Sequence, residues 1–464
     1  MKFLTALGST ILLSAAATAS AQSAKPVDAP PPPNAENRSP NRADAGASML
    51  SQRFSITAAQ AQERIDLQEE ISRLSQSLAE ANPDSFGGIW VEHEPTYKII
   101  VAFNDSSDRT ALRQSVSPTL RRYLQILPVR RSLKSIRDDQ AIILSALASA
   151  GVEMTISYEP KSQKFQLDVA DPAQGDRLRD LVPPSLRADV QVRRGLSTRE
   201  VQSGVQSGDA LYGGWGYYDS AGNPNCTFAF VTRSHEGKDA ILTASNNHCS
   251  VTTPYVGQTT HWVVLPAAYY SQSNTASGIT YDFRAHVITG LVNGPYVYFT
   301  NNQPVRGYTQ YVNSVPNMAS SGYFTVTGAV SNSTSSNYGY FIGMAICKSG
   351  NRTGLTCGQV TSTSASGTSI GNSGTTTYSG LIRVGQSNQS VNAYSGDSGG
   401  AVFTAPDSTS RIKAAGIMKS AETINGSPCY RGSGYDCGYF FMPTDRINDV
   451  YPMQIKTETG TVNP

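Results

Sequence analysis

The distribution of charged side chains divides the chain into two parts that we expect to fold differently. Residues 22–208 carry 23 basic and 23 acidic side chains, 46 in 187 positions. Residues 209–464 carry 13 basic and 12 acidic side chains, 25 in 256 positions, together with all six cysteines and four of the five histidines. At 464 residues the chain is long enough for about two or three domains. The sequence therefore predicts two differently built domains.

The overall charge excludes some classes of partner. With 37 Lys and Arg against 35 Asp and Glu, the formal net charge is only +2. A near-neutral chain offers no basic face to a polyanion, so we expect neither nucleic acid nor an anionic membrane as a partner.

The first 21 residues have the pattern of a secretory signal peptide. Lys2 supplies a positive charge, an apolar run extends to Ala17, and Ala19-Ser20-Ala21 provides the small residues of a cleavage site. The run is too short to span a bilayer, and no other segment is long and apolar enough. We expect cleavage after Ala21, secretion to the extracellular medium, and no membrane attachment of the mature protein.

Residues 22–46 predict a linker, because Pro30–Pro33 favours an extended backbone and nothing apolar is offered for burial. Residues 47–196, which contain no cysteine, predict a small α+β module. Its expected elements are helices at Thr57–Leu78 and Asp138–Ala150 and strands at Ile99–Phe103, Met154–Tyr158 and Lys164–Val169, with Val182-Pro183-Pro184 ending a further short helix.

The second part predicts an all-β barrel or sandwich, because short alternating runs are separated by turn clusters such as Ser331–Asn337 and no long helix is evident. The expected strands include Phe228–Val231, Ala240–Leu242, Tyr296–Phe299, Tyr323–Val326 and Ala414–Met418.

The six cysteines fall into three pairs of near neighbours, which are Cys226 with Cys249, Cys347 with Cys357, and Cys429 with Cys437. Sequence alone allows other connectivities, but secretion favours disulfides and local pairing is the simplest choice. Because the chain has no C-x-x-C pair and no histidine cluster, we expect no metal site and no cofactor.

The stretch most informative about chemistry is Gly396-Asp397-Ser398-Gly399-Gly400. A serine between glycines can lie on a tight loop whose backbone N–H groups point outward and hold the oxyanion of a tetrahedral intermediate. The alternative is an ordinary glycine-rich turn, of which this domain has many. We favour Ser398 as a nucleophile because a chance match to all five residues is rare.

A serine nucleophile needs a base, and His248 is our candidate. It follows an expected strand, and Cys249 directly after it would fix the turn by pairing with Cys226. His235 is expected at a hairpin tip. The base in turn needs an acid. Only Asp282 and Asp397 lie between His248 and Ser398, and Asp397 adjoins the serine, so Asp282 is the expected acid.

The order His248, Asp282, Ser398, together with the Leu242-Thr243-Ala244 turn and the GDSGG motif, resembles the chymotrypsin-type serine proteases. The cysteine hairpin Cys347–Gly358 is similar to that of the bacterial secreted branch, the streptogrisin and α-lytic-protease type. Residues 86–101 resemble the opening of that branch's pro-region. Nearly the whole chain after the linker is therefore similar to this branch.

The resemblance implies two antiparallel six-stranded β-barrels, with the active site between them, preceded by an α+β pro-domain. One barrel would supply His248 and Asp282 and the other Ser398. Ser398 would attack the scissile carbonyl while His248 takes its proton and Asp282 orients His248. The backbone N–H groups of Gly396 and Ser398 would hold the oxyanion.

The resemblance also suggests a specificity pocket, although two of its motifs depart from the family pattern. The family usually has one residue between the alanine and the histidine of this turn, whereas Ser245-Asn246-Asn247 separates Ala244 from His248 here, so the turn is two residues longer. Asn392 stands where the branch has a cysteine, so Cys429 and Cys437 would pair with each other. The pocket candidates are Asn392, Ala393, Lys419, Ser420 and Ala421. No deep acidic residue is evident there, which favours a small or medium apolar side chain in the substrate.

Residues 47–196 would be a pro-region that assists folding and inhibits the enzyme, and residues 197–464 the protease domain, with cleavage expected in Leu196–Tyr212. The expected partners are peptide or protein substrates and the chain's own pro-region, and we expect a monomer. An α/β-hydrolase is excluded because no histidine follows Ser398. The remaining alternative is a secreted β-domain for adhesion or sugar binding, with an inactive protease-like site.

Overall fold

The computed structural model describes residues 45–462 with internal gaps. The gaps are 106–109, 148–149, 151, 196, 200–209, 221–223, 246–248, 250, 259–260, 269, 277–278, 289–290, 301–320, 331–338, 372–373, 386–392, 395, 408, 425–426 and 430–434. The expected signal peptide, most of the linker and of the cleavage region, the turn at Ser331–Asn337, His248 and Asn392 lie outside the described residues.

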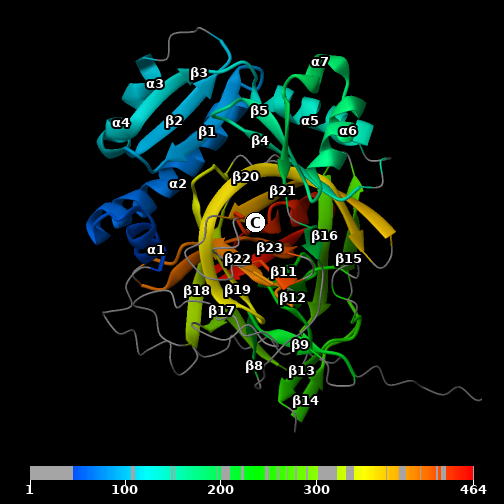
Figure 1. Cartoon of the computed structure of the whole chain (residues 1–464). Coiled ribbons are helices and arrows are strands. Elements are labelled where there is room, and N and C mark those ends of the chain that lie inside the picture. The colour runs from blue at the N-terminus through cyan, green and yellow to red at the C-terminus, as the bar shows by residue number, and fades with distance from the viewer. Residues whose placement is uncertain are drawn as a thin grey trace, which may run out of the picture.

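The amino-terminal segment, residues 45–194, begins with two helices beside a small sheet (Figure 1). Its first elements are α1 (Ala45–Phe54), α2 (Ala58–Ala81), β1 (Phe86–Glu92), β2 (Lys98–Phe103), α3 (Thr110–Ser115), α4 (Pro118–Tyr123) and β3 (Leu124–Pro128). Strand β2 lies between β1, which is antiparallel to it, and β3, which is parallel. Thr57 caps α2 through a capping box with Gln60. The helix expected from Thr57 and the strand expected at Ile99–Phe103 are confirmed.

The second half of this segment forms another α+β layer. Its elements are α5 (Leu133–Leu147), β4 (Met154–Glu159), β5 (Lys164–Val169), α6 (Pro172–Leu181), α7 (Pro184–Arg187) and β6 (Val190–Arg194). The two expected strands are confirmed. Helix α5 begins earlier than the expected Asp138, because the Ser132 hydroxyl accepts from the Ser135 N–H and stabilises an earlier start. Helix α6 ends before the Pro183-Pro184 pair as expected, and Pro184 then begins α7.

The carboxy-terminal segment, residues 210–462, is rich in β-strands, and its described residues contain one helix. The elements are β8 (Ala210–Gly213), β9 (Gly216–Tyr218), β10 (Pro224–Thr227), β11 (Val231–Ser234), β12 (Asp239–Thr243), β13 (Tyr255–Gln258), β14 (His261–Val264), β15 (Tyr270–Ala276), β16 (Ile279–Val287), β17 (Val292–Thr300), β18 (Ser321–Ala329), β19 (Ala345–Gly350), β20 (Gly354–Gly371), β21 (Gly374–Gly385), β22 (Ala401–Thr404), β23 (Arg411–Ile424), β24 (Ser427–Pro428), β25 (Tyr439–Pro443), α8 (Arg446–Val450), β26 (Met453–Thr457) and β27 (Gly460–Val462). A short strand, β7 (Ser197–Arg199), precedes them.

Two sheets of this segment matter for the site. A 6-stranded sheet has the order β15-β16-β12-β11-β26-β27. A 14-stranded sheet contains β19, β22 and β23, and it continues through β20 into β4, β5 and β6 of the amino-terminal segment. Figure 1 shows β20 arching beneath that segment. The two segments therefore share one continuous hydrogen-bonded sheet.

Most strand expectations in this segment are confirmed, since four of the named runs fall within β12, β17, β18 and β23. The strand expected at Phe228–Val231 is wrong in its start, because β11 begins at Val231. Ala229 and Phe230 still pair with Leu242 through backbone hydrogen bonds of 2.7 and 3.0 Å. Phe228 bonds instead with Gly214 and Trp215, so the regular ladder with β12 starts only at Val231.

The three disulfides connect near neighbours in the sequence, as expected. They are Cys226–Cys249, Cys347–Cys357 and Cys429–Cys437. The first joins β10 to the residue that follows His248, and the second crosses the β19–β20 ladder. Each closes a short loop and stabilises the fold by restricting the unfolded chain.

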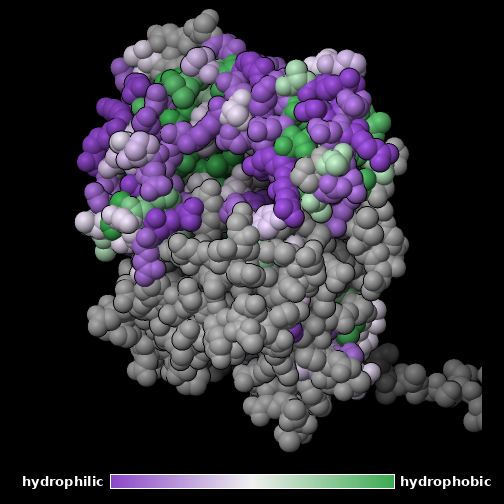
Figure 2. Space-filling view, in the orientation of Figure 1, coloured by the Kyte–Doolittle hydropathy of each residue, from purple (hydrophilic) through white to green (hydrophobic). Residues whose placement is uncertain are grey.

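The exposed face of the amino-terminal segment is mostly hydrophilic, as Figure 2 shows, in keeping with its high charge. None of the described helices is long and apolar enough to cross a bilayer. On the inner side, apolar residues of α1 and α2 join the core of the carboxy-terminal segment. Leu50 packs in a cluster with Phe324 and Phe403, and Ile71 in a cluster with Phe341 and Phe441.

His93 lies at the contact between the two segments. Its Nε2 is 3.1 Å from the Gly343 carbonyl oxygen, and its Nδ1 is 3.2 Å from Arg64 Nη1. These bonds fit a neutral ring that donates from Nε2 and accepts at Nδ1. Burial lowers the pKa of His93 to about 4; the bond to Gly343 opposes this shift, and Arg64 and Arg53 add to it. A proton on Nδ1 would replace the bond to Arg64 with repulsion.

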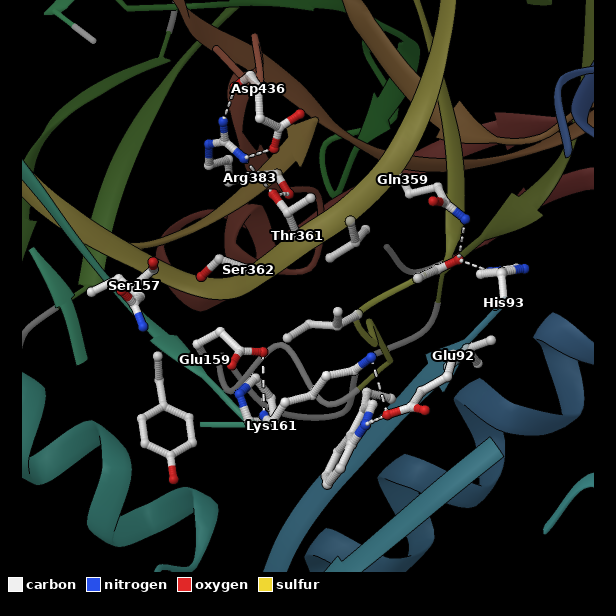
Figure 3. A pocket seen from close by; sticks show the side chains of 18 of the residues that line it. Glu92, His93, Ser157, Glu159, Lys161, Gln359, Thr361, Ser362, Arg383 and Asp436 are labelled. Atoms are coloured by element: carbon white, nitrogen blue, oxygen red, sulfur yellow. Dashed lines mark hydrogen bonds and ion pairs between the residues drawn. The ribbon is translucent and has the colours of Figure 1, made fainter. Parts of the chain in front are cut away.

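A cavity of about 430 Å³ beside this contact is lined by both segments. Figure 3 shows His93 and Gln359 converging on the Gly343 carbonyl at one side, with Glu92 and Lys161 paired below them in this view. His93 is therefore buried but borders a polar space through which a proton can reach it.

Acidification is expected to loosen this contact. A separated His93 would titrate near the usual histidine pKa of about 6.5. The docked state binds fewer protons than the separated state, so the stabilisation of the contact is fully present above pH 6.5 and is lost as the pH falls toward about 4. In this range the equilibrium constant for docking should fall by up to about tenfold per pH unit. Hydrogen-exchange protection of the Val91 amide, which donates to Ile342 across the contact, measures this.

His93→Gln keeps a donor for Gly343 and cannot titrate, so the protection of Val91 should become nearly independent of pH. His286→Gln serves as the matched control, because burial also lowers the pKa of His286 to about 4 but this residue lies within the carboxy-terminal segment. A pH-independent protection of Val91 in the unchanged chain would contradict the prediction.

Candidate functional site

Ser398 lies on a tight turn that ends directly before β22. Gly396 and Gly399 have φ angles of 104° and 84°, which favour glycine. A Cβ on Gly399 would lie 2.2 Å from Thr243 Oγ1. The Gly399 N–H donates to the Met418 carbonyl on β23 at 2.7 Å. The glycines of the motif are therefore required by backbone conformation and close packing.

The buried side chain of Asp397 holds this turn through hydrogen bonds to neighbouring backbone. Its oxygens accept the backbone N–H groups of Arg352, Thr353 and Tyr394 at 2.8–3.1 Å. Lys348 Nζ lies 3.1 Å from Asp397 Oδ2, and both side chains have 0% exposure. Burial lowers the pKa of Lys348, and Asp397 opposes that shift. Asp397 is therefore a structural residue of the turn, held by a buried counter-charge.

The residues on either side of His248 lie against this turn. The Cys249 Sγ is 3.9 Å from the Ser398 carbonyl oxygen, and Ala244 N lies near the site of a Cβ on Gly399. The Cys249 N–H donates to the Ser245 carbonyl at 2.8 Å, which closes the loop between them. His248 itself is outside the described residues, so its assignment as the base stays a prediction.

Asp282, on β16, is buried beside this loop. Its Oδ1 accepts the N–H and the hydroxyl of Ser245 at 2.9 and 2.5 Å. Its Oδ2 lies 3.0 Å from Lys419 Nζ. The Lys419 carbonyl oxygen accepts the hydroxyl of Ser398 at 3.0 Å. Lys419 therefore links the predicted acid and the predicted nucleophile.

Arg284 holds the same loop at both ends. It lies two residues after Asp282 on the same face of β16. Its Nε donates to the Ala244 carbonyl at 3.2 Å, and its Nη2 donates to the Cys249 carbonyl at 2.5 Å. The longer turn that carries His248 is thus clamped by a buried guanidinium. Sequence reasoning missed Arg284, although its spacing from Asp282 was a usable signal.

The other histidines of this segment are placed differently. His286 is fully buried, and its Nδ1 lies 2.9 Å from the Pro266 carbonyl oxygen. Its Nε2 has no hydrogen-bond partner in the described part of the chain. His235 follows β11 in a turn, as expected, and stacks edge-on against Tyr451. His261 lies in β14.

Three of the predicted pocket residues, Lys419, Ser420 and Ala421, lie on β23. Ser420 and Ala421 pair with Phe440 and Tyr439 across the β23–β25 ladder, and Ala393 is buried. Asn392 lies outside the described residues. The structure adds the buried acid Glu422, which the sequence reasoning did not consider. Arg383 binds its two carboxylate oxygens at 2.8 Å each, so its charge is already paired.

A segment of the chain itself covers part of β23. Strand β7 pairs antiparallel with it, with Arg199 opposite Ala421 and Ser197 opposite Thr423. Ser398 is 2% exposed. The backbone of β7, just before the carboxy-terminal segment, thus occupies the edge of β23 from Ala421 to Thr423, which begins two residues after Lys419.

No group of three or more His, Cys, Asp or Glu side chains within the described residues is arranged to hold a metal ion. The chemistry of the site comes from a hydroxyl, a carboxylate, an ammonium and backbone N–H groups. Such a set is suited to proton transfer and to the stabilisation of a developing oxyanion.

No protein-family model matches the chain, and no curated protein matches it. Its neighbours among solved structures are bacterial chymotrypsin-like serine proteases, and the likeness covers about half of this chain. Thermobifida fusca Protease A is 22% identical, with 53% of this chain and 99% of that chain covered and a TM-score of 0.32. Nocardiopsis protease and a glutamic acid specific serine protease are each 20% identical, with 53% and 100% covered and TM-scores of 0.33.

Lys348→Met should lower the free energy of unfolding by about 3–5 kcal/mol, because it leaves the Asp397 carboxylate buried without its counter-charge. Urea unfolding measures the change. The double variant Lys348→Met/Asp397→Asn should recover part of the loss, since it removes both charges. Lys413→Met is the matched control, because its pair with Glu69 is partly exposed and should contribute less than about 1 kcal/mol. Equal losses in the two single variants would contradict the assignment.

Proposed function

We propose that the chain is a secreted serine endopeptidase that is made as an inhibited precursor. The observation that carries the proposal is the placement of Ser398 and Asp282 on either side of Lys419, against the loop that contains His248. The GDSGG motif and the sequence order of the three residues add to it.

Peptide hydrolysis would run through an acyl-enzyme. The Ser398 hydroxyl attacks the scissile carbonyl while His248 takes its proton, and His248 then gives that proton to the leaving amine. Water attacks the acyl-enzyme in the second half of the reaction and restores Ser398. Asp282 orients His248 and stabilises its protonated form.

The oxyanion of each tetrahedral intermediate would be held by the N–H groups of Gly396 and Ser398. Neither N–H donates to a partner within the described residues. The positive φ of Gly396 supports this role, because such a backbone conformation can direct neighbouring N–H groups of a loop toward one anion. Such preorganised donors commonly account for the largest part of the rate enhancement.

The architecture proposed for this activity is a pair of six-stranded β-barrels with the site between them. It is supported by the origin of the site residues. Asp282 and the flank of His248 come from β16 and β12 of one sheet, and Ser398 precedes β22 of another. Residues 197–464 would form this protease domain, with the mature start between 197 and 212.

Residues 47–196 would be the pro-region, acting as intramolecular chaperone and inhibitor. Inhibition of the uncleaved chain is supported by β7 (Ser197–Arg199), which directly follows the pro-region within the expected cleavage region and pairs with β23, the strand edge that an extended peptide substrate would need. The pairing of β4 with β20 supports a folding role, because all-β topologies with distant contacts fold slowly and a preformed strand offers a template.

The substrates would be peptides or proteins with a small or medium apolar side chain before the cleaved bond. Support comes from the buried neighbours of the pocket strand, Tyr439 and Phe440, and from Arg383, which already pairs the nearby acid Glu422. Secretion, a monomeric state and the absence of metal, nucleic acid and membrane partners belong to the same proposal. The alternative is an adhesion or binding domain with an inactive site.

Covalent labelling with a fluorophosphonate decides between these two functions. Ser398 of the processed chain should form a stable phosphonyl ester, because only an activated serine hydroxyl attacks the reagent at a useful rate. The labelled residue is identified by peptide mass spectrometry. Ser398→Ala should abolish labelling and accumulate the full-length precursor, if the chain processes itself. A folded, processed chain that stays unlabelled would support the binding-domain alternative.

His248→Ala should lower turnover by several orders of magnitude, because the triad acts as a unit. His286→Ala should cost little, because the His286 ring is buried against Pro266 and not against the Ser398 turn. The two histidines form a matched pair, since His286 is four residues from Asp282 in the sequence and His248 follows Ser245, whose N–H donates to Asp282. The measurement is kcat/KM on a peptide substrate. The reverse result, with His286 essential and His248 dispensable, would overturn the assignment of the base.

A further inference from the structure

Lys419 contacts both the nucleophile and the acid of the proposed triad. Its carbonyl oxygen accepts the Ser398 hydroxyl at 3.0 Å, and its Nζ lies 3.0 Å from Asp282 Oδ2. The side chains of Lys419 and Asp282 are 6% and 2% exposed. Lys419, predicted from the sequence only as a pocket residue, thus forms a buried ion pair with Asp282.

The two oxygens of Asp282 have different partners. Oδ1 accepts two hydrogen bonds from Ser245, which begins the loop carrying His248. Oδ2 faces the Lys419 ammonium. A buried carboxylate is costly unless it is paired and hydrogen-bonded, and here both conditions are met. Lys419 therefore stabilises the ionised form of Asp282 in a site that water hardly reaches.

The other charges around Asp282 engage different partners. On β16, Arg284 binds the carbonyls of Ala244 and Cys249 and the hydroxyl of Tyr217. The charged groups on neighbouring elements include Glu422 with Arg383, Asp397 with Lys348, and Asp239 with Arg233 and Lys456. Helix α8 carries Asp449 and Arg446, which follows Asp445 and binds the Thr280 carbonyl.

We propose that Lys419 is a positioning residue of the triad, which pairs with Asp282 and thereby sets the pH range over which the base accepts the proton of Ser398. This inference rests on the proposed function. An isolated carboxylate beside a histidine favours the protonated ring, whereas a carboxylate already paired with a cation favours it less. Lys419 therefore keeps the base neutral, and the enzyme active, at a lower pH than a two-residue Asp–His pair would allow.

Removal of the charge should move the acid limb of activity to higher pH. In Lys419→Gln, the amide can still donate to Asp282 but carries no charge, so the midpoint should rise by about one pH unit, the effect of one charge several ångströms away in a partly shielded site. The readout is the second-order rate constant of fluorophosphonate labelling of the processed chain, measured from about pH 4 to pH 9. The same series with casein gives kcat/KM.

Three further variants make the result specific. Lys419→Arg keeps a cation and should keep the acid limb of the unchanged enzyme, even if its labelling is slower. Lys419→Met removes both the charge and the hydrogen bond to Asp282, and its acid limb should move to higher pH as in Lys419→Gln. It serves as the test variant if Lys419→Gln does not fold. Lys413→Gln removes a partly exposed lysine of the same strand and should not move the limb.

The possible outcomes separate this inference from the proposed function. An unlabelled parent enzyme would overturn the proposed function itself. A labelled parent whose acid limb coincides with that of Lys419→Gln or Lys419→Met would overturn the role of Lys419 alone. A folded Lys419→Gln that is inert at every pH would also overturn it, because the amine would then be needed in the chemistry and not beside it.

Discussion

The turn that presents Ser398 depends on the buried carboxylate of Asp397. This group accepts N–H groups from the Arg352–Thr353 turn and from Tyr394, and its charge is balanced by Lys348 at the start of the same hairpin. A carboxylate is too costly to bury without all of these partners. The turn and the β19–β20 hairpin therefore stabilise each other through Asp397, and Ser398 is positioned by both.

A second buried charge organises the other half of the site. Asp282 reaches from the 6-stranded sheet to Lys419 on β23, while Arg284 fastens both ends of the loop between Ala244 and Cys249. The proposed reaction would need its groups held within a fraction of an ångström, and charged hydrogen bonds in a dry environment provide that precision. The site thus lies between two sheets and is held by two buried ion pairs, Asp282–Lys419 and Asp397–Lys348.

Local features of this fold could be predicted from the sequence, and long-range pairings could not. Thr57 with Gln60 marks the start of α2, and cysteine spacing indicates the three disulfides. The motif at Ser398 and the scarcity of acidic residues point to Asp282. The partners Lys348, Ser245 and Lys419 were beyond reach, because a buried lysine looks like a surface lysine until the strand register is known. The start of α5 was missed because Ser132 caps it from outside the apolar pattern.

If the chain is processed as proposed, the ladder between β4 and β20 has a consequence for the part that stays behind. Ser366, Gly367 and Thr368 pair there with Ile156, Thr155 and Met154. Once β4 departs, these residues become an open strand edge with unsatisfied amide and carbonyl groups, and such an edge is a template for another chain. Release would therefore exchange an intramolecular partner for the hazard of aggregation. While it stays attached, the amino-terminal segment covers the edge of β20 and prevents it from pairing with strands of other copies of the protein, which matters most at high protein concentration.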